Sequence, residues 1–345
     1  MREVPAHAPE HRSEDLIGRI VPDDPEFRFR ITAALADAEK WLQDCVGSAP
    51  DPRVAALTSH LAAAGGKRLR PLLVLLGAEF GEPWRHGVTE AAVLSELVHI
   101  SSLHHDDVMD GADTRHGAPS VHARWGERAA VLSGDWLLAR AAGLAASLGP
   151  EAVALNARTA ERLVAGQLRE LTGPAPGQDP VAHYFRVAEG KTAALMALSL
   201  VSGAVQAGTP APCVPALTEY AEQLGIAFQI ADDLLDLTSL AELTGKDLGR
   251  DLLTGVPSLP VLLALAGSSP GDQELRTLLG DGSVTDPADH RRALELFGRS
   301  PAIGEARTMV RQRLDRARAA LEALPDLPAR RALTELCDVV AESRV

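Results

Sequence analysis

Residues 93–110 read Val-Leu-Ser-Glu-Leu-Val-His-Ile-Ser-Ser-Leu-His-His-Asp-Asp-Val-Met-Asp, an apolar stretch that ends in a group of aspartates. Its apolar residues Val93, Leu97, Ile100 and Leu103 recur at steps of three and four, which is the period of an α-helix. The stretch therefore predicts a helix whose C-terminal end carries several carboxylates.

The same period recurs along most of the chain, for example over residues 31–42 and 224–230, whereas the alternation typical of strands is scarce. Gly- and Pro-rich breaks separate these stretches. The pattern predicts an all-α fold of about ten to twelve helices with short links. We expect residues 1–24 to form a flexible N-terminal segment and residues 25–345 to form a single domain.

Charge, cysteine spacing and apolar runs exclude several classes of protein. The 345 residues carry a net charge of −13, which argues against a general nucleic-acid binder. Cys45, Cys213 and Cys337 lie far apart in the sequence, which favours reduced thiols over disulfides or zinc ligands. The first residues are polar and lack the pattern of a signal peptide. The longest apolar run, residues 192–207, is shorter than a membrane span and predicts a buried helix. We therefore expect a cytoplasmic protein without a membrane span.

Two acidic motifs are the strongest chemical signal. Residues 106–110 (Asp-Asp-Val-Met-Asp) and 232–236 (Asp-Asp-Leu-Leu-Asp) share one spacing, and each follows an apolar helical stretch. On a helix, positions i and i+4 share a face, so each motif gathers carboxylates that raise one another's pKa unless a cation lies among them. Magnesium is held by one or two carboxylates together with water and substrate phosphate. Two such motifs predict a magnesium–diphosphate site.

Short cationic segments accompany these motifs. The chain has four lysines among 34 basic residues, and Lys67, Lys191 and Lys246 all lie in such segments. Residues 65–71 (Gly-Gly-Lys-Arg-Leu-Arg-Pro) join flexible backbone to three cations, a pattern suited to phosphate. Residues 190–192 (Gly-Lys-Thr) are expected to begin the apolar helix, where the helix dipole would favour an anion.

With these motifs in this order, the chain resembles the trans-isoprenyl diphosphate synthases, the polyprenyl synthetase family, from about residue 27 to the C-terminus. The matching segments are residues 65–71, 96–99 (Glu-Leu-Val-His), 105–110, 115–117 (Arg-His-Gly), 134–138 (Gly-Asp-Trp-Leu-Leu), 166–167 (Gly-Gln), 190–193, 228–236, 245–246 and 251–252.

The resemblance implies a transferase with the isoprenoid synthase fold, a helical bundle around a deep central cavity. It implies a Mg²⁺-dependent homodimer that condenses an allylic diphosphate, such as farnesyl or geranylgeranyl diphosphate, with isopentenyl diphosphate into an all-trans polyprenyl diphosphate. The implied metal ligands are Asp106, Asp107, Asp110, Asp232, Asp233 and Asp236, which act in catalysis together with Lys191. The implied substrate-binding residues are Lys67, Arg70, His99, Arg115, His116, Thr192, Gln229 and Lys246.

Two positions depart from the family pattern. His116 stands where a second arginine is usual, and histidine carries at most partial charge near neutral pH, so we expect weaker isopentenyl diphosphate binding than in relatives. Val256 stands where many members have a lysine.

Product length depends on how far the growing tail can extend below the first acidic motif. Ser102 lies one turn before Asp106, and Ser101 adjoins it. Two small side chains leave room, which favours a medium- or long-chain product over geranylgeranyl diphosphate. The alternative is that both serines merely pack, and that a helix near Leu132 and Trp136 forms the floor.

Two other functions stay open at this stage. A class I terpene cyclase of related fold would ionise an allylic diphosphate alone, but it usually lacks the Gly-Gly-Lys segment and has more cavity aromatics. A non-catalytic subunit of a heterodimeric synthase would have no need of six mutually repelling aspartates.

Overall fold

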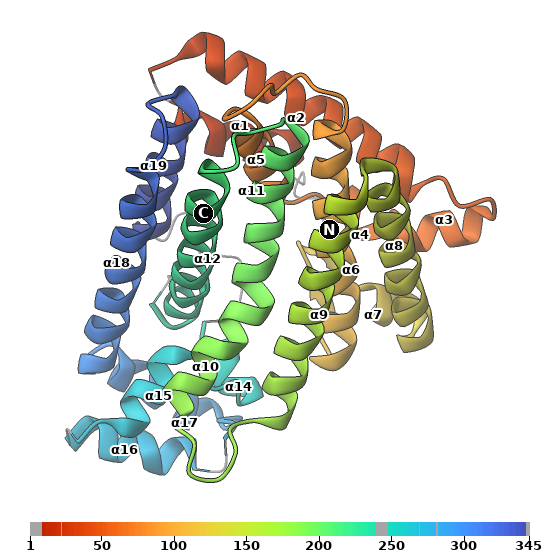
Figure 1. The fold of residues 1–345 in the computed structure, drawn as a ribbon. Helices are drawn as coiled ribbons and strands as arrows, with labels where there is room; N and C mark the ends of the chain where they lie inside the picture. Colours follow the sequence, from red (N-terminus) through yellow and green to blue (C-terminus); the bar gives the residue numbers. More distant parts are fainter. Residues whose placement is uncertain (1–8, 22, 239–247, 269, 281, 343–345) are drawn as a thin grey trace.

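The structure is a computed structural model that describes residues 9–21, 23–238, 248–268, 270–280 and 282–342. Within these residues the fold is helical apart from one short hairpin (Figure 1), which confirms the predicted all-α class. The N-terminal half contains α1 (Pro9–Ile20), α2 (Pro25–Val46), α3 (Pro52–Thr58), α4 (His60–Ala63), α5 (Leu69–Ala78), α6 (Val88–Met109), β1 (Thr114–Arg115), β2 (Ala118–Pro119), α7 (Val121–Trp125), α8 (Glu127–Leu148) and α9 (Pro150–Thr172).

In the C-terminal half, all secondary structure of the described residues is helical. This half contains α10 (Pro180–Ala188), the π-helical turn η1 (Glu189–Ala193), α11 (Ala194–Gln206), α12 (Cys213–Thr238), α14 (Arg250–Thr254), α15 (Leu259–Ala266), α16 (Pro270–Leu279), α17 (Pro287–Phe297), α18 (Pro301–Leu321) and α19 (Pro328–Ala341). The described α-helices outnumber the expected ten to twelve, in part because α3, α4, α7 and α14 have seven residues or fewer, too few to show a period.

The centre of the bundle is built by α5, α6, α11 and α12 (Figure 1), in which α11 contacts the other three and α5 also contacts α6. Nearly every residue of α5 is buried, as are residues 194–204 of α11, because these helices are apolar on all sides. The burial of α11 confirms that the longest apolar run forms a core helix. No helix in the described ranges combines the length and hydropathy that crossing a bilayer requires.

One expectation about this core helix is wrong. Residues 190–192 do not begin a helix, because α10, η1 and α11 follow one another with helical backbone at both junctions. The π-helical turn is an insertion of the kind that is common at functional sites. Lys191 and Thr192 are therefore placed by this turn and not at a free helix N-terminus, so the helix-dipole argument does not apply to them.

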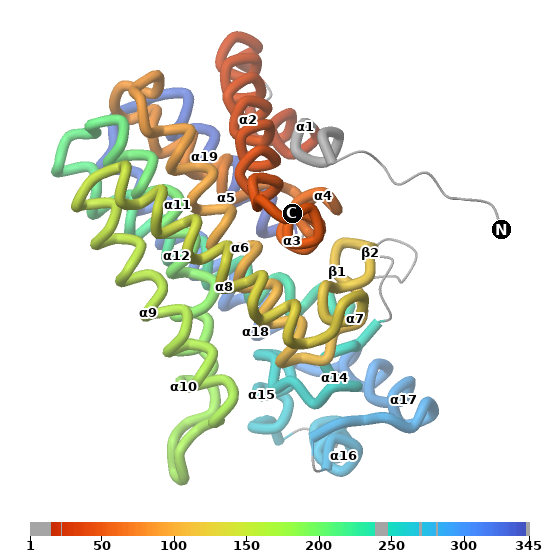
Figure 2. The backbone as a smooth tube through the Cα atoms, turned by 90° about the vertical axis from the view of Figure 1, so that its right-hand side faces the viewer, coloured from red at the N-terminus to blue at the C-terminus, as the bar shows by residue number. Residues whose placement is uncertain are grey.

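The expectation of a flexible segment over residues 1–24 needs correction from residue 9 onward, while residues 1–8 lie outside the described residues. Residues 9–20 form α1, which contacts α2 and α19 (Figure 2). Leu16, Ile17, Ile20 and Val21 are buried in the main hydrophobic cluster. Their spacing is helical, but the apolar stripe is only one turn long among charged residues, so the sequence gives little sign of it.

Candidate active site

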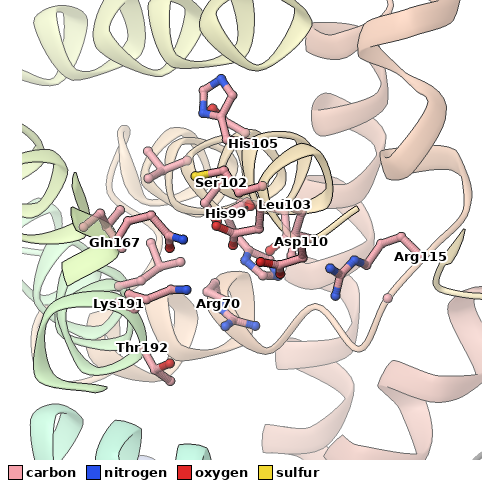
Figure 3. A pocket seen from close by; sticks show the side chains of 18 of the residues that line it. Arg70, His99, Ser102, Leu103, His105, Asp110, Arg115, Gln167, Lys191 and Thr192 are labelled. Atoms are coloured by element: carbon pink, nitrogen blue, oxygen red, sulfur yellow. Dashed lines mark hydrogen bonds between the residues drawn. The ribbon is translucent and has the colours of Figure 1, made fainter. Parts of the chain in front are cut away.

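A cavity of about 770 Å³ lies among α5, α6, α8, α9, η1, α11 and α12, and the hairpin β1–β2 borders it. Its lining includes most of the residues that the sequence singles out (Figure 3). These are Lys67, Arg70, His99, Ser101, Ser102, Asp106, Asp110, Arg115, His116, Lys191, Thr192, Gln229 and Asp232. The fold therefore joins segments that lie up to 165 positions apart in the sequence.

The aspartates of the first acidic motif have two kinds of surroundings. Asp106 and Asp110 line the cavity, since they lie one turn apart at the end of α6. Asp107 is fully buried, and the Arg115 guanidinium donates to its Oδ1 through Nε at 2.8 Å and Nη2 at 2.6 Å. Asp107 thus holds Arg115 at the cavity wall, where Figure 3 shows Arg115 beside Asp110.

Asp106 lies in strained electrostatic surroundings. Its pKa is raised to about 6, first by burial and then by the charges of Asp110 and Glu170, while Lys191 acts in the opposite direction. A cation bound between these carboxylates would relieve this cost.

The aspartates of the second acidic motif, on α12, also differ in their surroundings. Asp232 lines the cavity. Asp236 does not line it, and accepts instead from the backbone N–H groups of Arg250 and Asp251 at 3.2 and 3.1 Å, which ties α12 to the start of α14.

Asp233 joins three helices and is also absent from the cavity wall. It accepts from the Tyr184 hydroxyl at 2.7 Å, the Gln229 amide at 3.0 Å and the Leu259 backbone N–H at 2.9 Å, which come from α10, α12 and α15. Burial raises the pKa of Asp233 to about 6, although these three hydrogen bonds each act to lower it. The carboxyl group therefore holds the back of the site together.

The π-helical turn supplies a cation and a hydroxyl. Lys191 donates to Glu170 of α9, and Thr192 donates to Gln229 Oε1 at 2.7 Å. Figure 3 shows Lys191 and Gln167 reaching from one side toward the space that Arg70 and Asp110 border from the other, while His105 points away. Lys191 is thus placed where it can exchange its carboxylate partner for another anion.

A second cationic group lies around the start of α5. Lys67 and Arg70 line the cavity, and burial lowers the pKa of Arg70 although Glu96 and Asp232 act to raise it. Burial and the charge of Arg70 lower the pKa of His99 well below its usual value, so His99 is neutral at physiological pH.

His116 occupies the hairpin between β1 and β2 with φ 52°, a left-handed conformation. The hairpin faces the loop of residues 65–70, because a Cβ atom added to Gly66 would lie 3.6 Å from His116 Cε1. His116, which departs from the family pattern, therefore borders the Lys67–Arg70 side of the cavity.

The remaining part of the cavity is apolar. Its lining includes Val98, Leu103, Leu138, Leu163 and Leu195. Phe228 is the one Phe, Tyr or Trp side chain among the described residues that line the cavity.

The two serines both lie on this apolar wall but differ in packing. Ser101 is fully buried and donates to the Gly134 carbonyl of α8 at 2.8 Å, whereas Ser102 is partly exposed to the cavity and bonds within its own helix. Leu132 and Trp136 themselves do not line the cavity, but Val131 and Leu138 of the same helix, α8, do, so a floor on this helix remains an alternative.

The donor set suits a hard cation that is shared with a ligand. In the part of the chain that the structure describes, no three acidic, histidine or cysteine side chains converge closely enough to hold a metal by themselves. Asp106, Asp110 and Asp232 nevertheless supply carboxylate oxygens to one cavity beside several cations. This arrangement fits magnesium, which binds through one or two carboxylates and takes its other ligands from phosphate and water.

One predicted residue is not described by the structure, and two residues of the site were not predicted. Lys246 lies outside the described residues. Sequence reasoning missed the role of Glu170 and Tyr184 as partners of Lys191 and Asp233. Glu170 follows the Gly-Gln pair at residues 166–167 by one helical turn, a spacing that could have drawn attention to it.

Comparison with known proteins gives a consistent result. A family model described as polyprenyl synthetase matches residues 51–297. A nonaprenyl diphosphate synthase of Mycobacterium tuberculosis is 41% identical over 91% of this chain and 94% of its own length. Component 2 of a heptaprenyl diphosphate synthase from Geobacillus stearothermophilus is 38% identical over 88% of this chain and 93% of its own length.

Comparison with solved structures indicates the same family. A geranylgeranyl pyrophosphate synthase of Corynebacterium glutamicum, complexed with calcium and isoprenyl diphosphate, has a TM-score of 0.83 at 39% identity, covering 93% of this chain and 98% of that chain. A polyprenyl synthase of Caulobacter crescentus, also with calcium and isoprenyl diphosphate, has a TM-score of 0.85 at 34% identity, covering 96% and 98%. Together with the two acidic motifs and their shared cavity, these matches establish that the chain belongs to the polyprenyl synthetase family.

Proposed function

We propose that this protein is a Mg²⁺-dependent trans-polyprenyl diphosphate synthase that condenses an allylic diphosphate with isopentenyl diphosphate and makes a medium- or long-chain product. The observation that carries the proposal is the single cavity in which Asp106, Asp110 and Asp232 face Lys67, Arg70, Arg115 and Lys191 above an apolar compartment. The relatives named as nonaprenyl and heptaprenyl diphosphate synthases support the longer product.

The cavity residues divide the work as follows. Asp106, Asp110 and Asp232 would hold magnesium, which supplies charge neutralisation to the leaving diphosphate. Arg115 and Lys191 contact the allylic diphosphate, and Lys191 leaves Glu170 to do so. Lys67, Arg70 and His99, with His116 at the border, take the isopentenyl diphosphate. Asp107, Asp233 and Asp236 act by positioning their neighbours.

The reaction follows from this placement. The allylic C–O bond breaks, the double bond of isopentenyl diphosphate attacks the allylic carbon, and a C–C bond forms. A proton then leaves the new chain for the released diphosphate. The leucine-lined compartment excludes water from the cationic carbon and accepts the growing tail.

The proposed catalytic unit is a single domain that extends through α1, since α1 is packed into the core. We further propose a homodimer through the outer faces of α8 and α9. These helices contact each other and leave Leu132, Val153 and Leu171, which do not line the cavity, at least 43% exposed. Single apolar side chains on a surface are ordinary, but three outside the cavity on two adjacent helices fit an interaction surface.

The test is an assay of the purified chain with magnesium, labelled isopentenyl diphosphate and farnesyl diphosphate, with products resolved by size. We expect a ladder that ends at hexaprenyl diphosphate or longer, and no product after chelation of the metal. A stop at geranylgeranyl diphosphate would refute the chain length alone. Free diphosphate with a hydrocarbon or alcohol, and no elongation, would favour a cyclase, although a cavity with one aromatic side chain speaks against it.

A further inference from the structure

The loop that leads into α5 has an unusual backbone. Gly65 and Gly66 have φ values of 90° and 154°, and Arg68 follows with φ 52°. Among the described residues outside glycine, only Arg68 and His116 have a positive φ. A left-handed conformation is unfavourable for a residue with a Cβ atom, so other interactions must hold Arg68 in it.

The side chain of Arg68 provides those interactions. Its guanidinium donates to both carboxylate oxygens of Glu39, at 2.6 and 3.0 Å, and to Glu96 Oε1 at 3.0 Å. It also donates to the carbonyls of Ala62 at 2.7 Å and Gly65 at 3.4 Å. All five donors of the guanidinium are thus used within the protein, and the residue is 5% exposed. Arg68 has no donor left for a substrate.

The residues around Arg68 border the cavity, as Arg68 itself and Glu96 also do. Lys67 and Arg70 flank it in the sequence and line the cavity. Glu96 lies between the two arginines: its charge acts on both, its Oε1 accepts from Arg68, and its buried Oε2 has no partner among the described residues. The buried Nε of Arg70 likewise has no partner there. The loop therefore uses every donor of Arg68 within the protein, while Lys67 and Arg70 line the cavity beside it.

Glu39 connects this loop to a helix outside the cavity. It lies on α2, does not line the cavity, and also accepts from Gln43 at 2.8 Å. Burial acts to raise the pKa of Glu39, but the hydrogen bonds and charge of Arg68 lower it overall, so Glu39 is ionised at neutral pH. A bidentate pair of this kind fixes direction as well as distance, which a lysine in place of Arg68 could not do.

We propose that Glu39 and Arg68 are positioning residues for the second diphosphate: the buried Glu39–Arg68–Glu96 network holds the loop of residues 65–70 in the conformation that binds isopentenyl diphosphate. This assignment rests on the proposed function for the identity of the ligand. Because the network touches only the Lys67–Arg70 side of the cavity, its loss acts on one substrate and not on the other.

The test compares Glu39→Gln with Glu79→Gln. Glu79 makes a similar two-point pair with Arg30, which is also on α2, at 3.3 and 2.8 Å and away from the cavity. In Glu39→Gln we expect the KM for isopentenyl diphosphate to rise about tenfold, while kcat and the KM for the allylic diphosphate change by less than about twofold. Arg68→Lys should show the same selective effect, and Glu79→Gln should leave both KM values unchanged.

A purely structural role would give a different pattern. Equal increases in both KM values, or a lower melting temperature with an unchanged KM for isopentenyl diphosphate, would overturn the proposal. If Glu39→Gln does not fold, Glu39→Asp, which keeps the charge but shortens the reach, is expected to raise the same KM by a smaller factor, and an unchanged KM would contradict us.

Failure of the proposed function can be distinguished from failure of this inference. If the unsubstituted protein performs no elongation, the function is wrong. Calorimetric titration with inorganic diphosphate, without magnesium, then tests the network alone: Glu39→Gln should bind about tenfold more weakly than the unsubstituted protein, and equal affinities would refute the role of Glu39.

Discussion

Asp106 and Asp107 are adjacent in the sequence but have different surroundings, because successive residues of a helix point about 100° apart. Asp106 lines the cavity, whereas Asp107 is buried and binds Arg115. The same division separates Asp232 from Asp233 on α12. Chemical type alone thus did not separate the aspartates that line the cavity from those that do not.

The buried Asp233 predicts a pH dependence of stability. Its pKa is about 6 in the folded protein, against about 3.9 for an unfolded chain. Below pH ~4 the carboxyl is protonated in both states. Between pH ~4 and ~6 it ionises first in the unfolded chain, so its contribution to stability is lost, by about 3 kcal/mol, as the pH rises through the folded-state value.

Melting curves without magnesium or substrate check this prediction. The melting temperature of the unsubstituted protein, relative to that of Asp233→Asn, should fall as the pH rises from about 4 to about 7. The exposed Asp289→Asn serves as the control and should follow the unsubstituted protein. Parallel curves for Asp233→Asn and the unsubstituted protein would show that Asp233 does not titrate in this range.

The two serines predict different consequences of adding an aromatic ring. Ser102→Phe places the ring in the apolar compartment, so we expect a shorter product with little loss of stability. Ser101→Phe should also shorten the product but lower the melting temperature, because Ser101 is fully buried against the Gly134 carbonyl of α8. Product ladders and melting curves measure both effects. A full-length ladder from Ser102→Phe would place the floor elsewhere, and Ser102→Ala should leave the ladder unchanged.

At the scale of elements, the bundle depends on close approach between α5 and α11. A Cβ atom added to Gly203 of α11 would lie 1.9 Å from the Val74 carbonyl oxygen of α5, and one added to Gly77 would lie 2.1 Å from the Leu200 carbonyl oxygen. Glycines on both helices therefore set the distance between their backbones, which in turn sets the distance between the loop of residues 65–70 and η1.

Gly203→Ala is expected to destabilise the protein by about 2 kcal/mol or more, because the backbones must move apart. Gly304 of α18 provides a matched control, since nothing lies within 4 Å of an added Cβ there. Gly304→Ala should stabilise the helix by about 0.5–1 kcal/mol. Denaturant unfolding of the two variants measures the difference, and similar stabilities would contradict the close-packing argument.

Prediction of elements from the sequence succeeded where a period was long enough. The helices that carry the two acidic motifs, α6 and α12, agree with the apolar spacing before each motif. The π-helical turn η1 was missed because a single inserted residue in a helix changes neither composition nor period. The apolar stripe of α1 was missed because one helical turn is too short to show a period.

At the scale of the whole molecule, the outer side of α8 and α9 predicts a dimer. Figure 2 looks onto the side of the bundle on which these helices run. Leu132 is 67% exposed there and does not line the cavity. Leu132→Glu is expected to convert the dimer into monomers, because a charge in an apolar interface loses its hydration without a partner.

Sedimentation or light scattering would measure the change in mass. Phe29 is 76% exposed on α2 and belongs to neither α8 nor α9, so Phe29→Glu should leave the oligomer intact. An oligomer that persists in Leu132→Glu but dissociates in Phe29→Glu would move the interface to α2. A monomeric unsubstituted protein would rule out the homodimer.

The amino-acid sequence by itself determined the helical class, the two acidic motifs, the cationic segments and the family, because each is written in local spacing and residue type. Only the tertiary structure decided which members of those motifs share the cavity. Asp107, Asp233 and Asp236 have partners that lie eight to 49 positions away, and Arg68 is anchored by residues 29 and 28 positions distant. Contacts at such separations depend on how the helices pack, and no local pattern in one sequence specifies them.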